Sequence, residues 1–285
     1  MRSVLVVFLL AAALTAVILG VDLLLPGISQ AGVQQNVLRL AILAVILYGA
    51  WLGLTRADFV GPARLTAWLA IAVPLLLWQS IVWLAASAGA FQTRIGPLPL
   101  LPVAIVLPLL IGLPVLLRSR TIGLVLDATP PSWLVGLQVY RVFGSVFLAG
   151  WIAGNLPGIF ALPAGAGDTL VGLLALPVAL LLRSDARGAV GLAVAWNVLG
   201  ILDLVNAVSI GALTTPGPLQ LIVPDRVNAV AAYPLVLIPA FAVPLSLLLH
   251  ATSLRQLRRL SRRPLSAFAK RSDTADTLKH APSSA

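Results

Sequence analysis

The chain has 285 residues, of which 60% are hydrophobic and 10% charged, and it carries a net charge of +10 with a mean hydropathy of +1.03. This composition lies far outside that of water-soluble globular domains and predicts an integral membrane protein. Cysteine is absent from the sequence, which excludes disulfides, thiolate metal sites and cysteine nucleophiles. The two histidines, His250 and His280, lie at or beyond the end of the last apolar run, so we expect no metal site and no cofactor.

Apolar runs long enough to cross a hydrocarbon core of about 30 Å, which takes about 20 helical residues, recur along the chain. We therefore predict an all-α transmembrane domain over residues 1–250. The first run is read as a helix and not as a cleaved signal peptide, because the DLLLPGISQ that ends it is not a small-residue cleavage site. The eight expected spans are residues 3–25, 37–55, 65–88, 97–117, 133–154, 158–182, 188–212 and 228–250.

The cationic residues predict the orientation, because positively charged loops stay in the cytoplasm. With the N-terminus inside, seven bases near the span ends and eight in the tail fall on the cytoplasmic side. Only Arg39, Arg94 and Arg226 fall on the opposite side. We therefore expect both termini in the cytoplasm. The Ala-, Leu- and Arg-rich composition is typical of a bacterium, which places the chain in a bacterial inner membrane.

Residues 251–285 are expected to form a basic cytoplasmic tail that is partly disordered. Most of its charge lies in RQLRRLSRRPLSAFAKR, residues 255–271. Directly after a membrane helix, such a segment more often binds anionic lipid than a protein or nucleic acid, each base contributing about 1 kcal/mol near the surface. The expected partners are therefore the lipid bilayer and anionic headgroups at the tail, with no nucleic acid.

Polar residues in the later spans are the candidate site, because an ionisable group in a span costs about 2.5–3.5 kcal/mol and normally has a partner inside the bundle. In the fifth span, Gln138, Arg141 and Ser145 share one face of an α-helix. At about 1.5 Å per residue, Asp168 and Asp203 lie at similar depths in the sixth and seventh spans. We expect a polar cluster among these three spans. Its candidate binding residues are Gln138, Arg141, Asp168, Asn197, Asp203 and Asn206.

The stretch FALPAGAGDTLVG, residues 160–172, places Asp168 after a proline and two glycines. Proline removes a backbone donor and glycine disfavours helix interiors, so we expect a broken or re-entrant element near 155–168. Asp168 would then be the N-cap of the following helix, with its carboxylate accepting from exposed backbone N–H groups. Broken backbone at membrane depth is tolerated where it lines a wet cavity, so a binding or catalytic carboxylate is the alternative.

The motif GAGD at residues 165–168 resembles the GxGD signature of intramembrane aspartyl proteases, the presenilin-like and prepilin-peptidase-like enzymes. This resemblance implies peptide-bond hydrolysis by a catalytic pair of Asp168 and Asp203. In those families the other aspartate precedes the motif, whereas Asp203 follows it. The match covers four residues.

A longer stretch, residues 138–206, resembles a family of uncharacterised bacterial polytopic inner-membrane proteins. The resemblance rests on the arginine of QVYRVFG, the LPAGAGD segment and the span containing WNVLGILDLVNA. It implies the same membrane fold and indicates no activity.

Two classes of function lead. The first is a small-solute or ion permease, because transporters hold charged groups near the midplane with intramembrane carboxylates and helix ends. The second is a non-transporting helper, sensor or assembly factor, in which the polar cluster is structural. The aspartyl protease is a third alternative. Other enzyme classes are disfavoured, because the sequence has no Walker A motif, nucleotide fingerprint or HExxH.

Overall fold

The computed structural model describes residues 2–25, 32–92, 94–95 and 98–261. Within these residues, eight helical segments are long and apolar enough to cross a membrane, which confirms the predicted all-α membrane fold. The segments are Ser3–Leu24, Val33–Arg56, Gly61–Ser87, Leu100–Arg118, Ser132–Ile152, Gly158–Arg183, Ala189–Thr214 and Ile238–Ser261.

The elements of the described residues are mostly long helices, with one pair of two-residue antiparallel strands. In chain order they are α1 (Arg2–Leu24), α3 (Val33–Arg56), α4 (Gly61–Ser87), β1 (Arg94–Ile95), β2 (Leu98–Pro99), α5 (Leu100–Arg118), α6 (Arg120–Ala128), α7 (Ser132–Leu137), the 3₁₀ helix η1 (Gln138–Gly144), α8 (Ser145–Ile152), α9 (Gly158–Arg183), α10 (Ala189–Thr214), the 3₁₀ helix η2 (Ala229–Ala231), the π-helix η3 (Ile238–Ala242) and α11 (Val243–Ser261).

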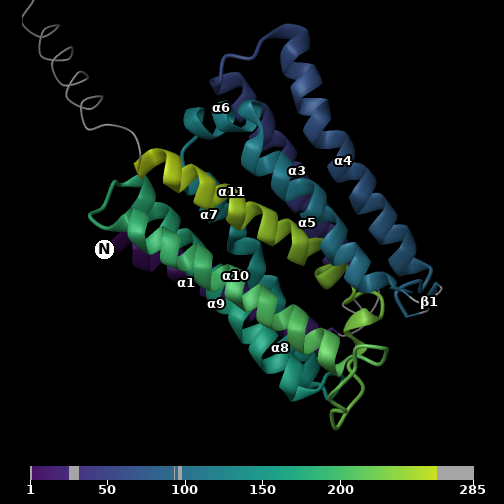
Figure 1. Cartoon of the computed structure of the whole chain (residues 1–285). Helices are drawn as coiled ribbons and strands as arrows, with labels where there is room; N and C mark the ends of the chain where they lie inside the picture. Colours follow the sequence, from purple (N-terminus) through teal and green to yellow (C-terminus); the bar gives the residue numbers. More distant parts are fainter. Residues whose placement is uncertain (1, 26–31, 93, 96–97, 262–285) are drawn as a thin grey trace, which may run out of the picture.

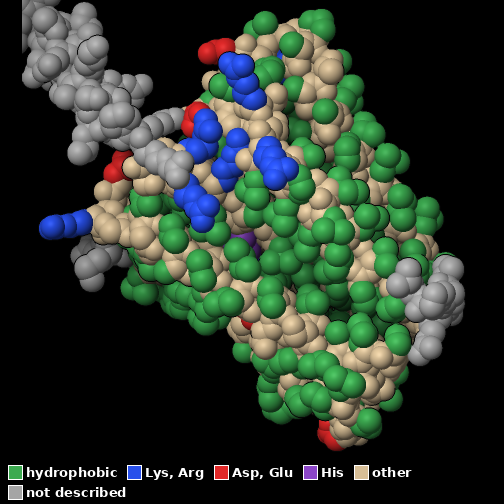
Figure 2. Space-filling model, viewed as in Figure 1, with side chains coloured by type: hydrophobic (Ala, Val, Ile, Leu, Met, Phe, Trp, Pro, Cys, Tyr) green, Lys and Arg blue, Asp and Glu red, His purple; other side chains and the backbone are tan. Residues whose placement is uncertain are grey.

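Helix α9 forms the centre of one group of helices, in which it packs against α1, α7, η1, α8 and α10. Helices α3 and α4 pack together on the other side, and α11 lies between α5 and α10 (Figure 1). We call the end where α5, α9 and α11 finish the basic end. The other end, with the β1–β2 pair and residues 215–237, is the hairpin end. Lys and Arg side chains gather near the basic end, while hydrophobic side chains cover most of the face seen in Figure 2.

Helix α9 is continuous over Gly158–Arg183. The prediction of a broken or re-entrant element near 155–168 is therefore wrong for the residues that lie in this helix. The chain turns before it, and Pro157 is the N-cap. Pro163 removes only one backbone donor, and the glycines serve close packing instead of a break. A Cβ at Gly165 would crowd Leu148, and one at Gly172 would run into the backbone of Val142. Small residues therefore let η1 and α8 approach α9 closely.

The last span also differs from the prediction of 228–250, because it runs over Ile238–Ser261. The apolar residues before it form a loop at the hairpin end, in which Asn228 caps η2. Residues 251–261 belong to α11 and not to the predicted tail, since their small and apolar face, including Ser253 and Leu257, is buried among the other helices. The rest of the expected tail, residues 262–285, lies outside the described residues.

Candidate functional site

Arg141, on η1, is the centre of a buried ionic network and is only 3% exposed. Its Nε donates to Asp168 Oδ1 at 2.8 Å, and its Nη2 lies 2.7 Å from the same oxygen. Nη2 also donates to Asp203 Oδ2 in a second ion pair. Nη1 donates to the Gly200 carbonyl at 3.3 Å and faces His250 Nε2 at 3.1 Å. The guanidinium has three nitrogens, and each of them makes at least one of these hydrogen bonds.

The network lies near the middle of the membrane-spanning helices. Asp168 is ten residues from the start of α9 and Asp203 is eleven from the end of α10, which at 1.5 Å per residue puts both about 15 Å from the hairpin end. His250 lies near the middle of the last span. A charged group at this depth is costly unless it is paired, and here two carboxylates share one guanidinium. With both carboxylates ionised and His250 neutral, the network would hold one negative charge more than positive charge.

The orientation of His250 follows from its neighbour Asn197. The Asn197 Nδ2 donates to the Ala193 carbonyl at 2.7 Å and to Ser253 Oγ at 3.1 Å. A carbonyl can only accept, so the amide nitrogen must point to it and the amide oxygen must face His250 Nδ1, at 2.9 Å. Nδ1 is therefore the protonated nitrogen, and Nε2 is free to accept from Arg141.

Three glycines make room for the charged groups. A Cβ at Gly144 would overlap Asp168, one at Gly167 would overlap the carboxylate of Asp203, and one at Gly200 would overlap the imidazole of His250. Each glycine lies on a different helix, so η1, α9 and α10 each face the network with a residue that has no side chain. The second glycine of the GAGD motif is thus a packing position for Asp203.

The structure brings Arg141, Asp168, Asp203 and Asn197 together, as the sequence predicts. The positions of Gln138 and Asn206 differ from the prediction, and so does the role of Asp168. Gln138 is buried but donates to the Ser246 carbonyl at 3.2 Å, beside the network and not within it. Asn206 is exposed on the outside of α10.

The predicted N-cap role of Asp168 is wrong, because the residue lies inside α9 and its carboxylate binds Arg141. The sequence analysis also missed His250 and Ser253, because it ended the last span at residue 250. Their spacing with Leu257 is i, i+3, i+7, the signature of one buried helix face, and would have revealed them.

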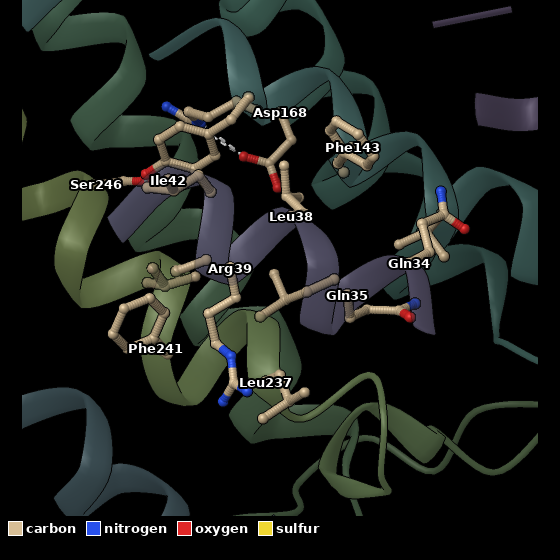
Figure 3. Close-up of a pocket in the computed structure, with 17 residues that line it drawn as sticks. Gln34, Gln35, Leu38, Arg39, Ile42, Phe143, Asp168, Leu237, Phe241 and Ser246 are labelled. Atoms are coloured by element: carbon tan, nitrogen blue, oxygen red, sulfur yellow. Dashed lines mark hydrogen bonds and ion pairs between the residues drawn. The ribbon is translucent and has the colours of Figure 1, made fainter. Parts of the chain in front are cut away.

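Asp168 lines two cavities. The smaller one, about 60 Å³, lies between α3, η1 and the start of α11 and also contacts Arg141 and Tyr140 (Figure 3). The larger one, about 500 Å³, lies at the hairpin end among α5, α9, α10 and residues 215–232, with apolar walls that include Phe147 and Phe160. Asp168 is therefore the network member that both cavities reach.

Comparison with known proteins gives a family match. The family model described as a domain of unknown function, DUF8737, matches residues 97–258, which is more than half of the chain. The matched residues include every member of the ionic network. No curated protein and no solved structure matches the chain.

Proposed function

The chain belongs to the DUF8737 family, and we propose that it is a small-solute or ion permease with its polar site among the fifth, sixth and seventh spans. The observation that carries this proposal is the contact of Asp168 with both cavities at mid-membrane depth. Its network has two carboxylates for one guanidinium, so the excess negative charge favours a cation or the cationic group of a solute at this point.

The packing on the two sides of the network supports this proposal. On the hairpin side, the cavity of about 500 Å³ reaches Asp168. On the basic side, a cluster of buried apolar residues fills the space between α7, α9, α10 and α11, with Val135, Trp196 and Leu257 among its members. A site that is reachable from one side and sealed on the other is what alternating access requires of one end state.

The orientation is part of the same proposal. The basic end would face the cytoplasm of a bacterial inner membrane, and the cavity at the hairpin end would face outward. Residues 262–285 would add bases that contact anionic headgroups at the cytoplasmic surface. Arg255 and Arg259 are not available for this, because Arg255 donates to the Ser119 carbonyl at 2.9 Å and Arg259 pairs with Asp127.

The test is a flux assay with the full chain in proteoliposomes, across a panel of monovalent cations, protons and small solutes. Wild-type protein should give a saturable flux for at least one of them. Asp168→Asn should remove that flux, because it neutralises the carboxylate that lines both cavities. Asp185→Asn is the matched control, because Asp185 is exposed in the α9–α10 connection and should not affect flux. Absence of flux across the whole panel would contradict the proposal.

The non-transporting alternative has one observation in its favour, which is that every guanidinium nitrogen of Arg141 has a hydrogen-bond partner within the protein. A purely structural network would make Asp168→Asn change stability without changing any flux. The protease alternative gains no support, because the guanidinium of Arg141 lies against both carboxylates and replaces the shared proton that an aspartyl dyad needs.

A further inference from the structure

The larger cavity has a single charged side chain in its wall. Among the described residues that line it, Asp168 is the only Asp, Lys, Arg or His. The smaller cavity differs, because Arg39 and Arg141 line it together with Asp168. A cation in the smaller cavity is therefore repelled by two guanidinium groups, whereas in the larger cavity the wall offers it a carboxylate and no positive charge.

This charge lies at the inner end of the cavity. Asp168 is ten residues from the start of α9, about 15 Å from the hairpin end. The other polar side chains of the wall lie at the hairpin end and are Gln92, Thr215 and Asn228. In the inner part of the cavity, the Asp168 carboxylate is therefore the only side-chain hydrogen-bond acceptor that the described residues provide.

One oxygen of Asp168 is not used by the ionic network. Oδ1 accepts from Arg141, but no described residue donates to Oδ2, and the side chain keeps 10% of its surface exposed. Figure 3 shows Oδ2 turned away from its dashed bond to Arg141 and toward Leu38. In an apolar medium the attraction between charges acts over several ångströms, so a cation at the inner wall is stabilised without contacting one particular oxygen.

The rest of the wall is apolar and partly aromatic. Leu101 and Ile105, four residues apart, place one face of α5 against the cavity. The rings of Phe147 and Phe160, whose centroids lie 5.2 Å apart, line it as well. Such a wall buries an apolar group and attracts an organic cation to its rings, but it lacks the several oxygen ligands that replace the water around a metal cation.

We propose that the larger cavity binds an organic cation with one positive charge and an apolar body, with the charge near Asp168 and the body between α5 and α10. The cavity of about 500 Å³ has the size of pockets that hold drug-sized ligands, about 300–1,000 Å³. As the class of solute carried, this inference rests on the proposed function. As a binding site, it is measured without any flux.

The experiment is equilibrium dialysis of the purified full chain in a non-ionic detergent at constant ionic strength, with protein-free micelles as the baseline. Benzyltrimethylammonium has both the charge and the apolar body, tetramethylammonium has only the charge, and benzyl alcohol has only the body. Benzyltrimethylammonium should bind saturably. The other two should each need a concentration higher by about tenfold or more, because one lacks the buried benzyl group and the other lacks the attraction to Asp168.

Two variants test the two parts of the site. Asp168→Asn should weaken benzyltrimethylammonium binding by about tenfold or more and leave benzyl alcohol binding unchanged, because it removes only the charge. Ala212→Phe should weaken the binding of both ligands, because Ala212 lines the cavity and a phenyl ring there fills part of it. The matched controls are Asp185→Asn and Ala195→Phe, both at exposed positions outside the cavity wall, and neither should change binding.

Binding that is unchanged in Asp168→Asn or in Ala212→Phe would overturn the site, and so would the absence of saturable binding above the micelle baseline. If Asp168→Asn does not fold, the order of the three ligands and Ala212→Phe decide. Tetramethylammonium bound as tightly as benzyltrimethylammonium would then refute the apolar part of the site. Binding in a protein without flux of any solute would uphold the site and contradict the permease proposal. Flux of an inorganic cation without this binding would do the opposite.

Discussion

His250 donates its Nδ1–H to Asn197 Oδ1 at 2.9 Å, and this one contact determines which ring nitrogen faces Arg141. The amide of Asn197 cannot be reversed, because its nitrogen is held by the Ala193 carbonyl at 2.7 Å. Asn197 on α10 therefore fixes the tautomer of His250 on α11. In this tautomer, His250 Nε2 can accept a hydrogen bond from Arg141 on η1.

The first prediction concerns this contact. Asn197→Ala leaves the buried Nδ1–H of His250 without an acceptor, so it should lower the free energy of unfolding by about 1–3 kcal/mol. Asn206→Ala is the matched control, since Asn206 is the same residue type on the same helix but exposed, and should stay within about 0.5 kcal/mol. Denaturant titration of the detergent-solubilised protein measures both. Equal losses for the two variants would show that the contact with His250 adds nothing.

The second prediction concerns the charges around Arg141. Arg141→Met leaves two buried carboxylates unpaired and should cost about 3–5 kcal/mol. Asp168→Asn or Asp203→Asn should each cost less, because one guanidinium then pairs with one carboxylate. In double-mutant cycles, Arg141→Met should couple to both aspartates by more than about 0.5 kcal/mol, measured as changes in the free energy of unfolding. Strictly additive losses would mean that the ion pairs contribute no coupling energy.

The third prediction concerns the glycines. Gly200→Ala places a methyl group against the buried imidazole of His250, which has no room to move, and should destabilise the protein by about 1–3 kcal/mol. On the same helix, a Cβ at Gly191 would meet nothing within 4 Å. Gly191→Ala should therefore be neutral or stabilise by up to about 1 kcal/mol through helix propensity. Thermal melts of the two variants side by side test the difference, and identical melts would refute it.

The fourth prediction concerns topology. Reporter fusions after Arg120, Arg187 and Arg271 should report the cytoplasm, because the basic end carries most of the arginines. Fusions near Gln92 and Gln220, both at the hairpin end, should report the periplasm. A periplasmic signal after Arg271 would reverse the orientation and with it the direction in which the larger cavity faces.

The meeting of Arg141 with Asp168 and Asp203 could be predicted from the sequence, because each charge in a span needs a partner of opposite charge. The helix boundaries were also predictable where apolar runs ended at arginines, as at Arg56, Arg118 and Arg183. Both conclusions rest on the cost of charge in lipid, which a single sequence shows directly.

The conformation around Asp168 could not be predicted in the same way. Proline and glycine have a local cost in a helix, but at Gly167 and Gly172 the contacts of α10 and η1 outweigh it, and those contacts join residues distant in sequence. The burial of His250 inside the last span could not be predicted for a similar reason. An apolar loop before residue 238 has the hydropathy of a span, whereas residues 251–261 are amphipathic and are buried only because other helices surround them.

The winding of η1 affects how the fifth span fits the bilayer. Its seven residues rise about 14 Å as a 3₁₀ helix, whereas an α-helix of that length would rise about 10.5 Å. The 21-residue segment Ser132–Ile152 is therefore about 3.5 Å longer than an unbroken α-helix and comes closer to the 26-residue segments beside it. An unbroken α-helix of 21 residues, about 31.5 Å long, would already cross a hydrocarbon core of about 30 Å, so the extra length carries the ends of this span further toward the ends of its longer neighbours, while Arg141 stays at the middle.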